Sequence, residues 1–172
     1  MKDKENKAYF SYPKETKESG DPKEIVDILK NAREKGQTVF TCGNGGSAAT
    51  AEHFSNDLFT RNIKAVCLNS NTSIMTMIGN DFGYEKTFSK QLEIYANVFP
   101  EPDILIVFSV SGNSKNILEA LKFPCTKIGF LGKGGKASEM VHYDITIDSK
   151  AFGLVESEHS RITHDIAEQL NL

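Results

Sequence analysis

The sequence predicts an α/β fold of three layers, in which helices cover both faces of a five-stranded parallel sheet. Two observations support this prediction. Five short apolar runs, each a candidate strand, follow one another along the chain, and helical patterns lie between most of them. Strands that alternate with helices are typical of parallel sheets, because a parallel strand needs a long crossover to return to the same edge.

The first predicted helix covers residues 23–35. From Ile25 the apolar residues recur at i, i+3, i+4 and i+7, the spacing of one helical face, and Gly36 supplies a C-terminal stop. The five strands are expected, in order, at TVFTC, KAVCLN, DILIVFS, TKIGFL and YDITI. Further helices are expected at AATAEHFSNDLF, TSIMTMIG, EKTFSKQLEIYANV and NSKNILEALK, and a last amphipathic helix from Glu156.

The length of 172 residues fits one domain, which we expect over residues 23–172. At this size roughly two-thirds of the surface of the unfolded chain can be buried, which is enough for one conventional core. Residues 1–22 are mostly polar and contain Pro13, Gly20 and Pro22. They predict an N-terminal arm that is either disordered or laid on a partner subunit.

The composition argues against several classes of function. The net charge of −3 gives no reason to expect binding to nucleic acid, and no apolar run approaches the roughly 18 residues of a membrane span. The N-terminus MKDKENKAYF has charges where a signal peptide has its apolar segment, so we expect a cytoplasmic protein. Three cysteines in apolar runs predict reduced core residues rather than disulfides: Cys42, Cys67 and Cys125.

A glycine-rich loop follows the first predicted strand and leads into a helix. It comprises Gly43, Asn44, Gly45, Gly46 and Ser47. Free backbone N–H groups and the positive end of the helix dipole favour an anion there, and glycines let the backbone approach it. The spacing matches neither a dinucleotide fingerprint nor a P-loop, so no nucleotide is indicated. A tight turn with Ser47 as N-cap explains the same residues.

A second loop of this kind follows the third predicted strand. Ser109, Ser111, Gly112, Asn113 and Ser114 give it hydroxyls and amides without a strong cation. Because the carboxyl ends of parallel strands meet at one edge of a sheet, the two loops can converge on one ligand. Hydroxyl-rich loops suit the phosphate of a phosphorylated sugar. The alternative is that each serine merely caps its helix.

Histidines and carboxylates at helical spacing predict a further cluster. His53 and Asp57 are four residues apart, so both side chains leave one face of a helix. On the last helix Glu156 and His164 lie about 80° apart around the axis, whereas His159 is about 140° from His164. Two imidazoles and two carboxylates form a suitable ligand set for zinc. Alternatively, His53 is simply packed and the others lie on solvated faces.

Four stretches resemble, in order, the signatures of the sugar isomerase (SIS) domain family, most closely its phosphoheptose isomerase branch: CGNGGSAATAEHF, IGNDFGYEKTFSKQ, FSVSGNS and VESEHSRITH. The resemblance covers roughly residues 23–170 and implies the flavodoxin-like sheet of that family. In the family the serine loop grips the phosphate. The residues implied here are Ser109, Ser111 and Ser114, assisted by Asn44 and Ser47.

The same resemblance implies a metal and a catalytic pair. The family uses an H-x-x-x-E pattern on the helix after the first loop, and a glutamine or glutamate plus a histidine on the last helix. The implied Zn²⁺ ligands are His53, Asp57, Glu156 and His164. Asp57 and His164 are then the catalytic base and acid, in either order, and Glu156 also contacts the substrate.

One residue departs from the family pattern. Asp57 stands where the best-known members have glutamate, which draws the carboxylate back by about 1.3 Å. A displacement of that order can slow a proton transfer about a hundredfold. The departure indicates either a site retuned for another substrate or a weakened or absent activity.

Three more residues are implied as substrate contacts. Arg61 is expected to meet the phosphate across a subunit boundary, and Asn80 with Asp81 resembles the sugar-binding segment of the family. Arg61 can equally be a surface residue that closes its helix. Asn80 and Asp81 can equally form a turn between helices.

The implied reaction is aldose–ketose isomerisation of sedoheptulose 7-phosphate to D-glycero-D-manno-heptose 7-phosphate for the heptose of surface polysaccharides, in a homotetramer with sites at subunit contacts. A proton leaves the carbon beside the carbonyl and returns to its neighbour through an enediol. Two alternatives stay open. One is an isomerase of another phosphosugar, and the other is a non-catalytic member of the family, such as a regulator of replication initiation.

Overall fold

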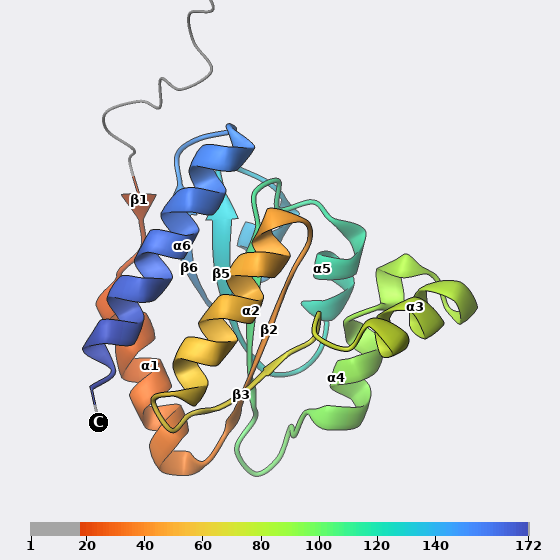
Figure 1. The fold of residues 1–172 in the computed structure, drawn as a ribbon, viewed down its shortest axis with the longest axis horizontal. Helices are drawn as coiled ribbons and strands as arrows, with labels where there is room; N and C mark the ends of the chain where they lie inside the picture. The colour runs from red at the N-terminus through yellow and green to blue at the C-terminus, as the bar shows by residue number, and fades with distance from the viewer. Residues whose placement is uncertain (1–17, 172) are drawn as a thin grey trace, which may run out of the picture.

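The computed structural model describes residues 18–171; residues 1–17 and 172, and with them most of the predicted arm over residues 1–22, lie outside this part of the chain. The predicted three-layer α/β/α architecture is confirmed (Figure 1). The strands are β1 (Glu18–Ser19), β2 (Thr38–Gly43), β3 (Lys64–Cys67), β4 (Ile104–Ser109), β5 (Thr126–Gly132) and β6 (Tyr143–Ile147). Strands β2 to β6 form the expected five-stranded parallel sheet, and the short β1 adds an antiparallel edge beside β6.

The helices lie close to their expected positions. They are α1 (Pro22–Lys35), α2 (Gly46–Phe59), α3 (Thr72–Asp81), α4 (Ser89–Tyr95), α5 (Lys115–Ala120) and α6 (Phe152–Gln169), with 3-10 turns η1 (Tyr84–Lys86) and η2 (Lys136–Glu139). The α1 helix ends at Gly36 in the left-handed conformation, as predicted. None of the helices within residues 18–171 is long and apolar enough to cross a membrane.

Two helix predictions differ from the structure. The last helix begins at Phe152, one turn before Glu156, and this added turn buries Leu154 and Val155. The sequence pattern placed the start of this helix too late because the added turn contains a glycine, which is a poor helix former. The stretch EKTFSKQLEIYANV splits into η1 and α4 because the hydroxyl of Thr87 donates to the Tyr84 carbonyl, a local bond that competes with helix continuation.

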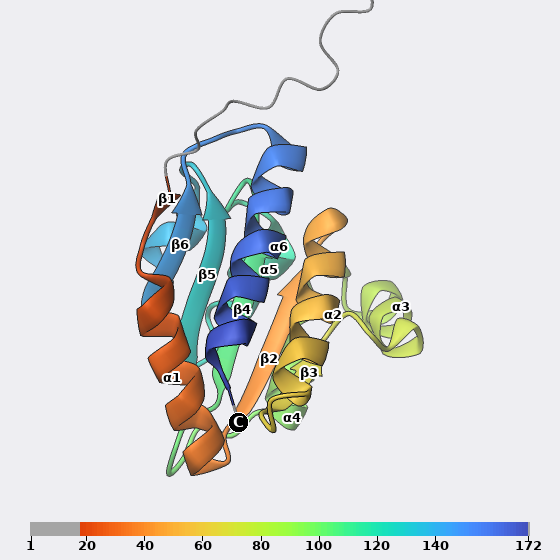
Figure 2. The ribbon, with the colours of Figure 1, turned by 60° about the vertical axis from the view of Figure 1, so that its left-hand side comes forward.

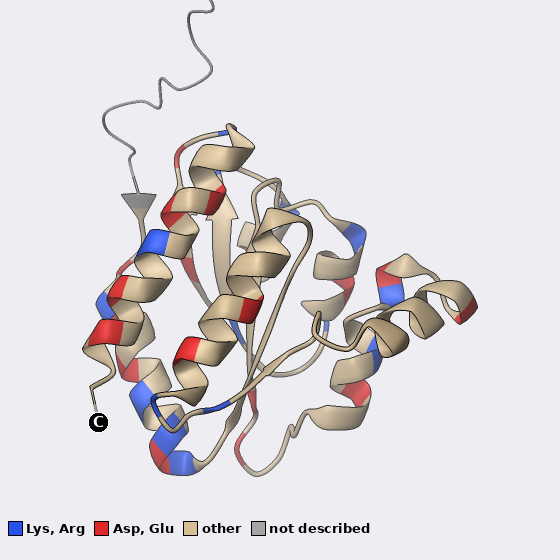
Figure 3. Ribbon diagram, viewed as in Figure 1, with Lys and Arg blue, Asp and Glu red and all other residues tan. Residues whose placement is uncertain are grey.

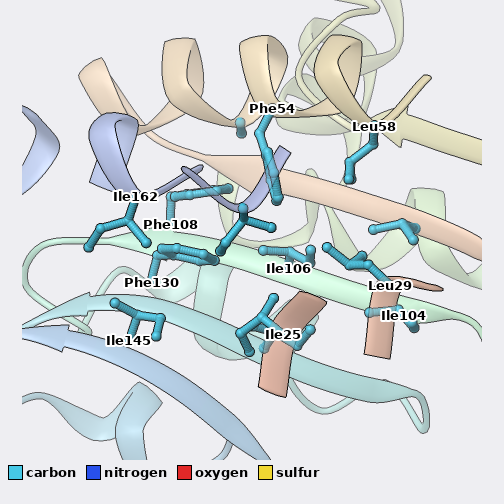
Figure 4. Packing of buried hydrophobic residues seen from close by; sticks show 14 of the residues in the cluster. Ile25, Leu29, Phe54, Leu58, Ile104, Ile106, Phe108, Phe130, Ile145 and Ile162 are labelled. Atoms are coloured by element: carbon cyan, nitrogen blue, oxygen red, sulfur yellow. The ribbon is translucent and has the colours of Figure 1, made fainter. Parts of the chain in front are cut away.

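The sheet divides the core into two halves. Along β4, Ile106 and Phe108 point to the layer of α1, α2 and α6, whereas Leu105 and Val107 point to the layer of α4 and α5. Figure 2 shows α1, α6 and α2 side by side over one face of the sheet. Figure 4 shows Phe54 of α2 packed against this face, where Phe108 and Phe130 stack with their ring centroids 4.8 Å apart. The two helical layers therefore bury both faces of every central strand.

The buried cysteines belong to this core. All three are free and buried, as the sequence predicts. Burial raises the pKa of the Cys42 thiol well above its usual value. Its thiolate, the reactive form, is therefore scarce at neutral pH.

The strand order explains where a ligand can bind. The order is β1-β6-β5-β4-β2-β3, so the chain reverses its direction across the sheet between β2 and β4. The loop after β2 leads to α2 on one face, and the loop after β4 leads to α5 on the opposite face. Two such loops leave a crevice between them at the carboxyl edge of the sheet. Both loops singled out in the sequence lie at this crevice.

Helix α3 stands away from the rest of the molecule, as both Figure 1 and Figure 2 show. The segment that follows it is fastened to the main body. Lys86 of η1 pairs with Glu119 of α5, and the side chain of Gln91 in α4 donates to the carbonyl of Leu68 after β3. These contacts hold residues 86–91, a few positions after Asn80 and Asp81, against the main body.

Candidate active site

The first loop makes a sharp turn between β2 and α2. Gly45 is the N-cap of α2 at φ 58° and ψ −126°, a conformation open essentially to glycine. Ser47 is therefore not the N-cap, and its buried side chain makes no capping hydrogen bond. Asn69 holds the strand end, because its side chain accepts from the N–H of Gly43 and donates to the carbonyl of the same residue.

The second loop is ordered by its own serines. The Ser109 hydroxyl oxygen accepts from the N–H of Gly112, and that of Ser111 accepts from the N–H of Asn113. Ser114 occupies the N-cap of α5 but makes no side-chain capping bond. The hydroxyls of Ser47 and Ser114 thus remain available to a ligand, which is not what a purely capping role predicts.

The two loops enclose a cavity of about 270 Å³. It brings together six residues singled out in the sequence: Asn44, Ser47, Ser109, Ser111, Ser114 and Glu156. The Glu156 carboxylate lies against Gly46, where a Cβ would collide with it. Phe108, Val110 and Phe152 complete the lining with apolar groups. We call this cavity the phosphate cradle, after the ligand that the sequence predicts for its two loops; free hydroxyls and a helix N-terminus line it.

A second cluster lies further along the contact between α2 and α6. His53 Nε2 lies 3.7 Å from Asp57 Oδ2, and His164 Nδ1 lies 3.4 Å from the same oxygen. The two imidazole rings meet edge to face with centroids 4.9 Å apart. The histidine side chains are half exposed, whereas that of Asp57 is only 19% exposed. Three residues from two helices thus converge on one point; we call them the triad.

The triad fits a divalent metal ion. Asp57 Oδ2 is buried and has no hydrogen-bond partner, so a strong acceptor lies between two imidazole nitrogens with nothing to satisfy it. One ligand atom from each of the three residues lies within 4.8 Å of the others. Tetrahedral zinc with bonds of 2.0–2.1 Å has ligand atoms about 3.3 Å apart, close to the separations seen at Asp57 Oδ2. The acidic residues of α2 are Asp57, which belongs to the triad, and Glu52, which is exposed and lies outside it (Figure 3).

Glu156 does not join the triad in this chain. Its carboxylate lies at the cradle beside Gly46, and the group of potential metal ligands comprises His53, Asp57 and His164 alone among residues 18–171. Three protein ligands with one open position are typical of catalytic zinc sites. The fourth implied ligand, Glu156, therefore lines the cradle instead of joining the triad.

His159 faces away from the site, as its angle from His164 suggested. It is buried, and its ring packs edge to face against Phe108 and Phe130. Nε2 bonds to the carbonyl of Leu131, which makes it the protonated nitrogen, and Nδ1 is buried without a partner. Burial lowers the pKa of His159 to about 4, against a smaller opposing effect of the Leu131 carbonyl. His159 is therefore a neutral core residue.

Arg61, Asn80 and Asp81 do not line the cradle of their own chain. Arg61 follows the far end of α2, and its guanidinium donates to the carbonyl of Ala167 near the end of α6. Asn80 and Asp81 are exposed at the end of α3, where the amide of Asn80 donates to the Asp81 carboxylate at 2.7 Å. The phosphate contact implied for Arg61 and the sugar contacts implied for Asn80 and Asp81 therefore need a second subunit or a different position of these segments.

Two residues that the sequence did not single out contact Asn44 of the cradle. Asn116 of α5 and Tyr84 of η1 both hydrogen-bond to the side chain of Asn44. An asparagine in the first turn of a helix is a weak signal, because asparagine favours local side-chain bonds over helix. Nothing in the sequence near Tyr84 points to Asn44, since only the folded chain brings the two together.

Comparisons with known proteins identify the family. The SIS domain family model matches residues 12–127. A phosphoheptose isomerase of Geotalea uraniireducens (strain Rf4) is 38% identical over 157 residues, which cover 85% of this chain and 82% of that protein.

Two solved structures are similar over most of their length. A phosphoheptose isomerase from Neisseria gonorrhoeae superposes with a TM-score of 0.81 at 29% identity, covering 87% of this chain and 84% of that one. One from Francisella tularensis gives a TM-score of 0.80 at 27% identity, covering 87% and 83%. The chain belongs to the SIS domain family, in its phosphoheptose isomerase branch.

Proposed function

We propose that this protein is an aldose–ketose isomerase that converts sedoheptulose 7-phosphate to D-glycero-D-manno-heptose 7-phosphate for surface polysaccharide heptose synthesis. One observation carries the proposal: the phosphate cradle and the triad lie on the same α2–α6 contact, one beyond the other. The relatives of known structure and the family membership supply the reaction class.

The spacing of the two features suits a seven-carbon sugar phosphate. Helices α2 and α6 run in the same direction from the cradle (Figures 1 and 2). His53 lies six residues beyond Ser47 and His164 eight beyond Glu156, which correspond to about 9 and 12 Å along the helices. An extended seven-carbon sugar measures about 10 Å from C1 to phosphorus at roughly 1.2 Å per bond. With its phosphate in the cradle, such a sugar places its first carbons at the triad.

The cradle holds the phosphate, which does not react. The hydroxyls of Ser47 and Ser114 and the N–H groups at the start of α2 donate to its oxygens. Ser109 and Ser111 shape the loop through their bonds to backbone N–H groups. Binding at a non-reacting group anchors the sugar so that the carbonyl end is presented in one orientation.

Asp57 and His164 transfer the proton. One of them takes the proton from the carbon beside the carbonyl, and it is returned to the neighbouring carbon. Because His164 Nδ1 faces the Asp57 carboxylate, Nε2 is the ring nitrogen left to exchange a proton with the substrate. His53, Asp57 and His164 would hold a zinc ion. Zinc when bound supplies polarisation of the substrate carbonyl.

The proposal includes an assembly of subunits. Ile94 and Phe99, at the end of α4 and just beyond it, are 79% and 85% exposed, and Tyr95 and Val98 between them are also exposed. Several large apolar side chains exposed within six consecutive residues are typical of an interface between subunits. It supports the homotetramer that the family resemblance implies, in which a neighbour can bring Arg61 to the cradle. The proposed unit is a single domain over residues 23–172 in the cytoplasm.

The direct test is an assay of the zinc-loaded protein with sedoheptulose 7-phosphate, following formation of the aldose. We expect turnover by the parent and a loss of at least about a hundredfold in both Asp57→Ala and His164→Ala. Glu52→Ala is the matched control, because Glu52 is an exposed carboxylate on the same helix. If the zinc-loaded parent isomerises only a five- or six-carbon phosphosugar, the proposed seven-carbon substrate is wrong. If it isomerises none, the protein is a binding member of the family.

A further inference from the structure

The side chain of Asn44 is held by two residues that lie outside the site predicted from sequence. Its Nδ2 donates to Asn116 Oδ1 at 2.9 Å, and its Oδ1 accepts from Asn116 Nδ2 at 2.8 Å. The same Oδ1 accepts from the hydroxyl of Tyr84 at 2.9 Å. Asn116 is only 2% exposed. The side-chain amide of Asn44 thus joins three elements: the loop after β2, the η1 turn and the start of α5.

The orientation of both amides follows from one backbone group. Asn116 Oδ1 lies 3.0 Å from the N–H of Ile117, which can only donate. The atom facing Ile117 must therefore be the oxygen of Asn116, and its nitrogen must face Asn44. Because that nitrogen donates, the atom of Asn44 opposite it is Oδ1. The backbone of α5 thus determines how Asn44 is turned.

This arrangement leaves the side chain of Asn44 with one free hydrogen-bond donor. Its Oδ1 accepts two hydrogen bonds, the usual limit of an amide oxygen, and one N–H of its Nδ2 is engaged by Asn116. The second N–H has no partner among residues 18–171. Asn44 lines the cradle, so the group it can offer to a ligand there is a donor and not an acceptor. A donor suits a phosphate oxygen, whereas a turned amide would present its oxygen to the anion and repel it.

We propose that Asn116 and Tyr84 are positioning residues that act through Asn44, fixing its amide so that an N–H donates to the phosphate of the bound sugar phosphate. The inference rests on the proposed function, because it needs an anion in the cradle. It also gives Tyr84 a linking role. Tyr84 follows Asn80 and Asp81 closely in the chain, and its bond to Asn44 ties that segment to the cradle.

A double-mutant cycle measures whether Asn116 acts through Asn44. Binding of inorganic phosphate is followed by titration calorimetry in the parent, Asn44→Ala, Asn116→Ala and the double variant. We expect Asn116→Ala to weaken phosphate binding about tenfold in the parent, the loss of one hydrogen bond to a charged group. In the Asn44→Ala background the same change should have almost no effect. Equal weakening in both backgrounds overturns the inference.

Tyr84→Phe is the milder variant, because it removes one hydroxyl from an exposed side chain and leaves the fold intact. We expect phosphate to bind about threefold more weakly, and the side-chain amide signals of Asn44 in a ¹⁵N correlation spectrum to shift. A Tyr84→Phe protein with unchanged Asn44 signals and unchanged phosphate affinity refutes the role of Tyr84. This variant also keeps the test valid if Asn116→Ala does not fold.

A stability control separates positioning from folding. Asp21→Ala removes the N-cap of α1, far from the cradle, and should lower the melting temperature without changing phosphate affinity. The outcomes for the two proposals are also distinct. If the parent binds no phosphate, the proposed function is contradicted. If the parent and Asn116→Ala bind phosphate with equal affinity, only the positioning role is contradicted.

Discussion

Asp57 Oδ2 lies 3.4 Å from His164 Nδ1, across the contact between α2 and α6, although the two residues are far apart in the sequence. The oxygen is buried and lacks a hydrogen-bond partner, which is costly for a carboxylate. Such a cost is typical of functional sites, where a ligand supplies the missing interaction.

Zinc should stabilise the protein through this oxygen. We expect added Zn²⁺ to raise the melting temperature of the parent, because an ion that binds only the folded state favours it, and to have little effect on Asp57→Ala. Without metal, Asp57→Ala should be as stable as the parent, since it removes an unsatisfied buried atom. Differential scanning fluorimetry with and without Zn²⁺ measures both. If Zn²⁺ also raises the melting temperature of Asp57→Ala, the ion binds elsewhere. Glu52→Ala is the control and should be stabilised by Zn²⁺ as much as the parent.

Removal of the Ser114 hydroxyl should weaken substrate binding more than it slows the reaction. Its hydroxyl makes no capping bond and faces the cradle, so it interacts equally with the phosphate in the ground and transition states. We expect Ser114→Ala to raise KM about tenfold with kcat nearly unchanged. Steady-state kinetics separate the two constants. Ser73→Ala, an exposed serine of α3, is the control, and a fall in kcat alone would argue against phosphate binding by Ser114.

A methyl group at Gly46 should displace Glu156. Because a Cβ there would collide with the Glu156 carboxylate, we expect Gly46→Ala to lower kcat/KM about tenfold. Stability should change little, since the helix preference of alanine over glycine offsets part of the cost of moving the flexible Glu156 side chain. Ala49→Gly on the same helix is the reverse control, with lower stability and unchanged kcat/KM. Chemical denaturation and kinetics on the two variants test this, and an unaffected kcat/KM in Gly46→Ala would show that Glu156 has no role.

His159 should make stability depend on pH. Burial lowers its folded-state pKa to about 4, below the value near 6.5 of the unfolded chain. The unfolded state therefore takes up a proton first as the pH falls, and stability is lost between pH 6.5 and 4, by about 3 kcal/mol from this group. Below pH 4 both states are protonated and the loss ends. Urea denaturation across this range should give a shallower dependence for His159→Gln; identical curves for both proteins would refute the assignment.

A charge at the exposed apolar surface should break the assembly. Ile94 and Phe99 are almost fully exposed in a single chain, and burying aspartate at an interface without a partner is strongly unfavourable. We expect the parent to sediment as a tetramer, and Ile94→Asp or Phe99→Asp to sediment as smaller species. Asn31→Asp, on the exposed side of α1, should leave the assembly intact. A monomeric parent in sedimentation velocity would contradict the proposed tetramer.

The fold was predictable because the apolar pattern has a fixed period. The run ILIVFS in β4 is buried on both sides, and its continuous apolar composition requires helices over both faces of the sheet. The two loops were recognisable because glycines and serines between a strand and a helix suit anion binding wherever the loops lie. Helical spacing singled out His53 and His164, and the family signatures then implied their roles. Boundaries were less certain, since a helix can begin at Phe152 beside a glycine when packing outweighs propensity.

The sequence by itself therefore determined which elements form, which residues are buried and which loops can hold a phosphate, because these depend on local spacing. Only the tertiary structure decided that Asp57 meets His164, that Glu156 lies at the cradle, and that His159 is a neutral core residue. It also brought Tyr84 and Asn116 to Asn44. Contacts between elements distant in the chain depend on the strand order and on the rotation of each helix about its axis, and local periodicity specifies neither.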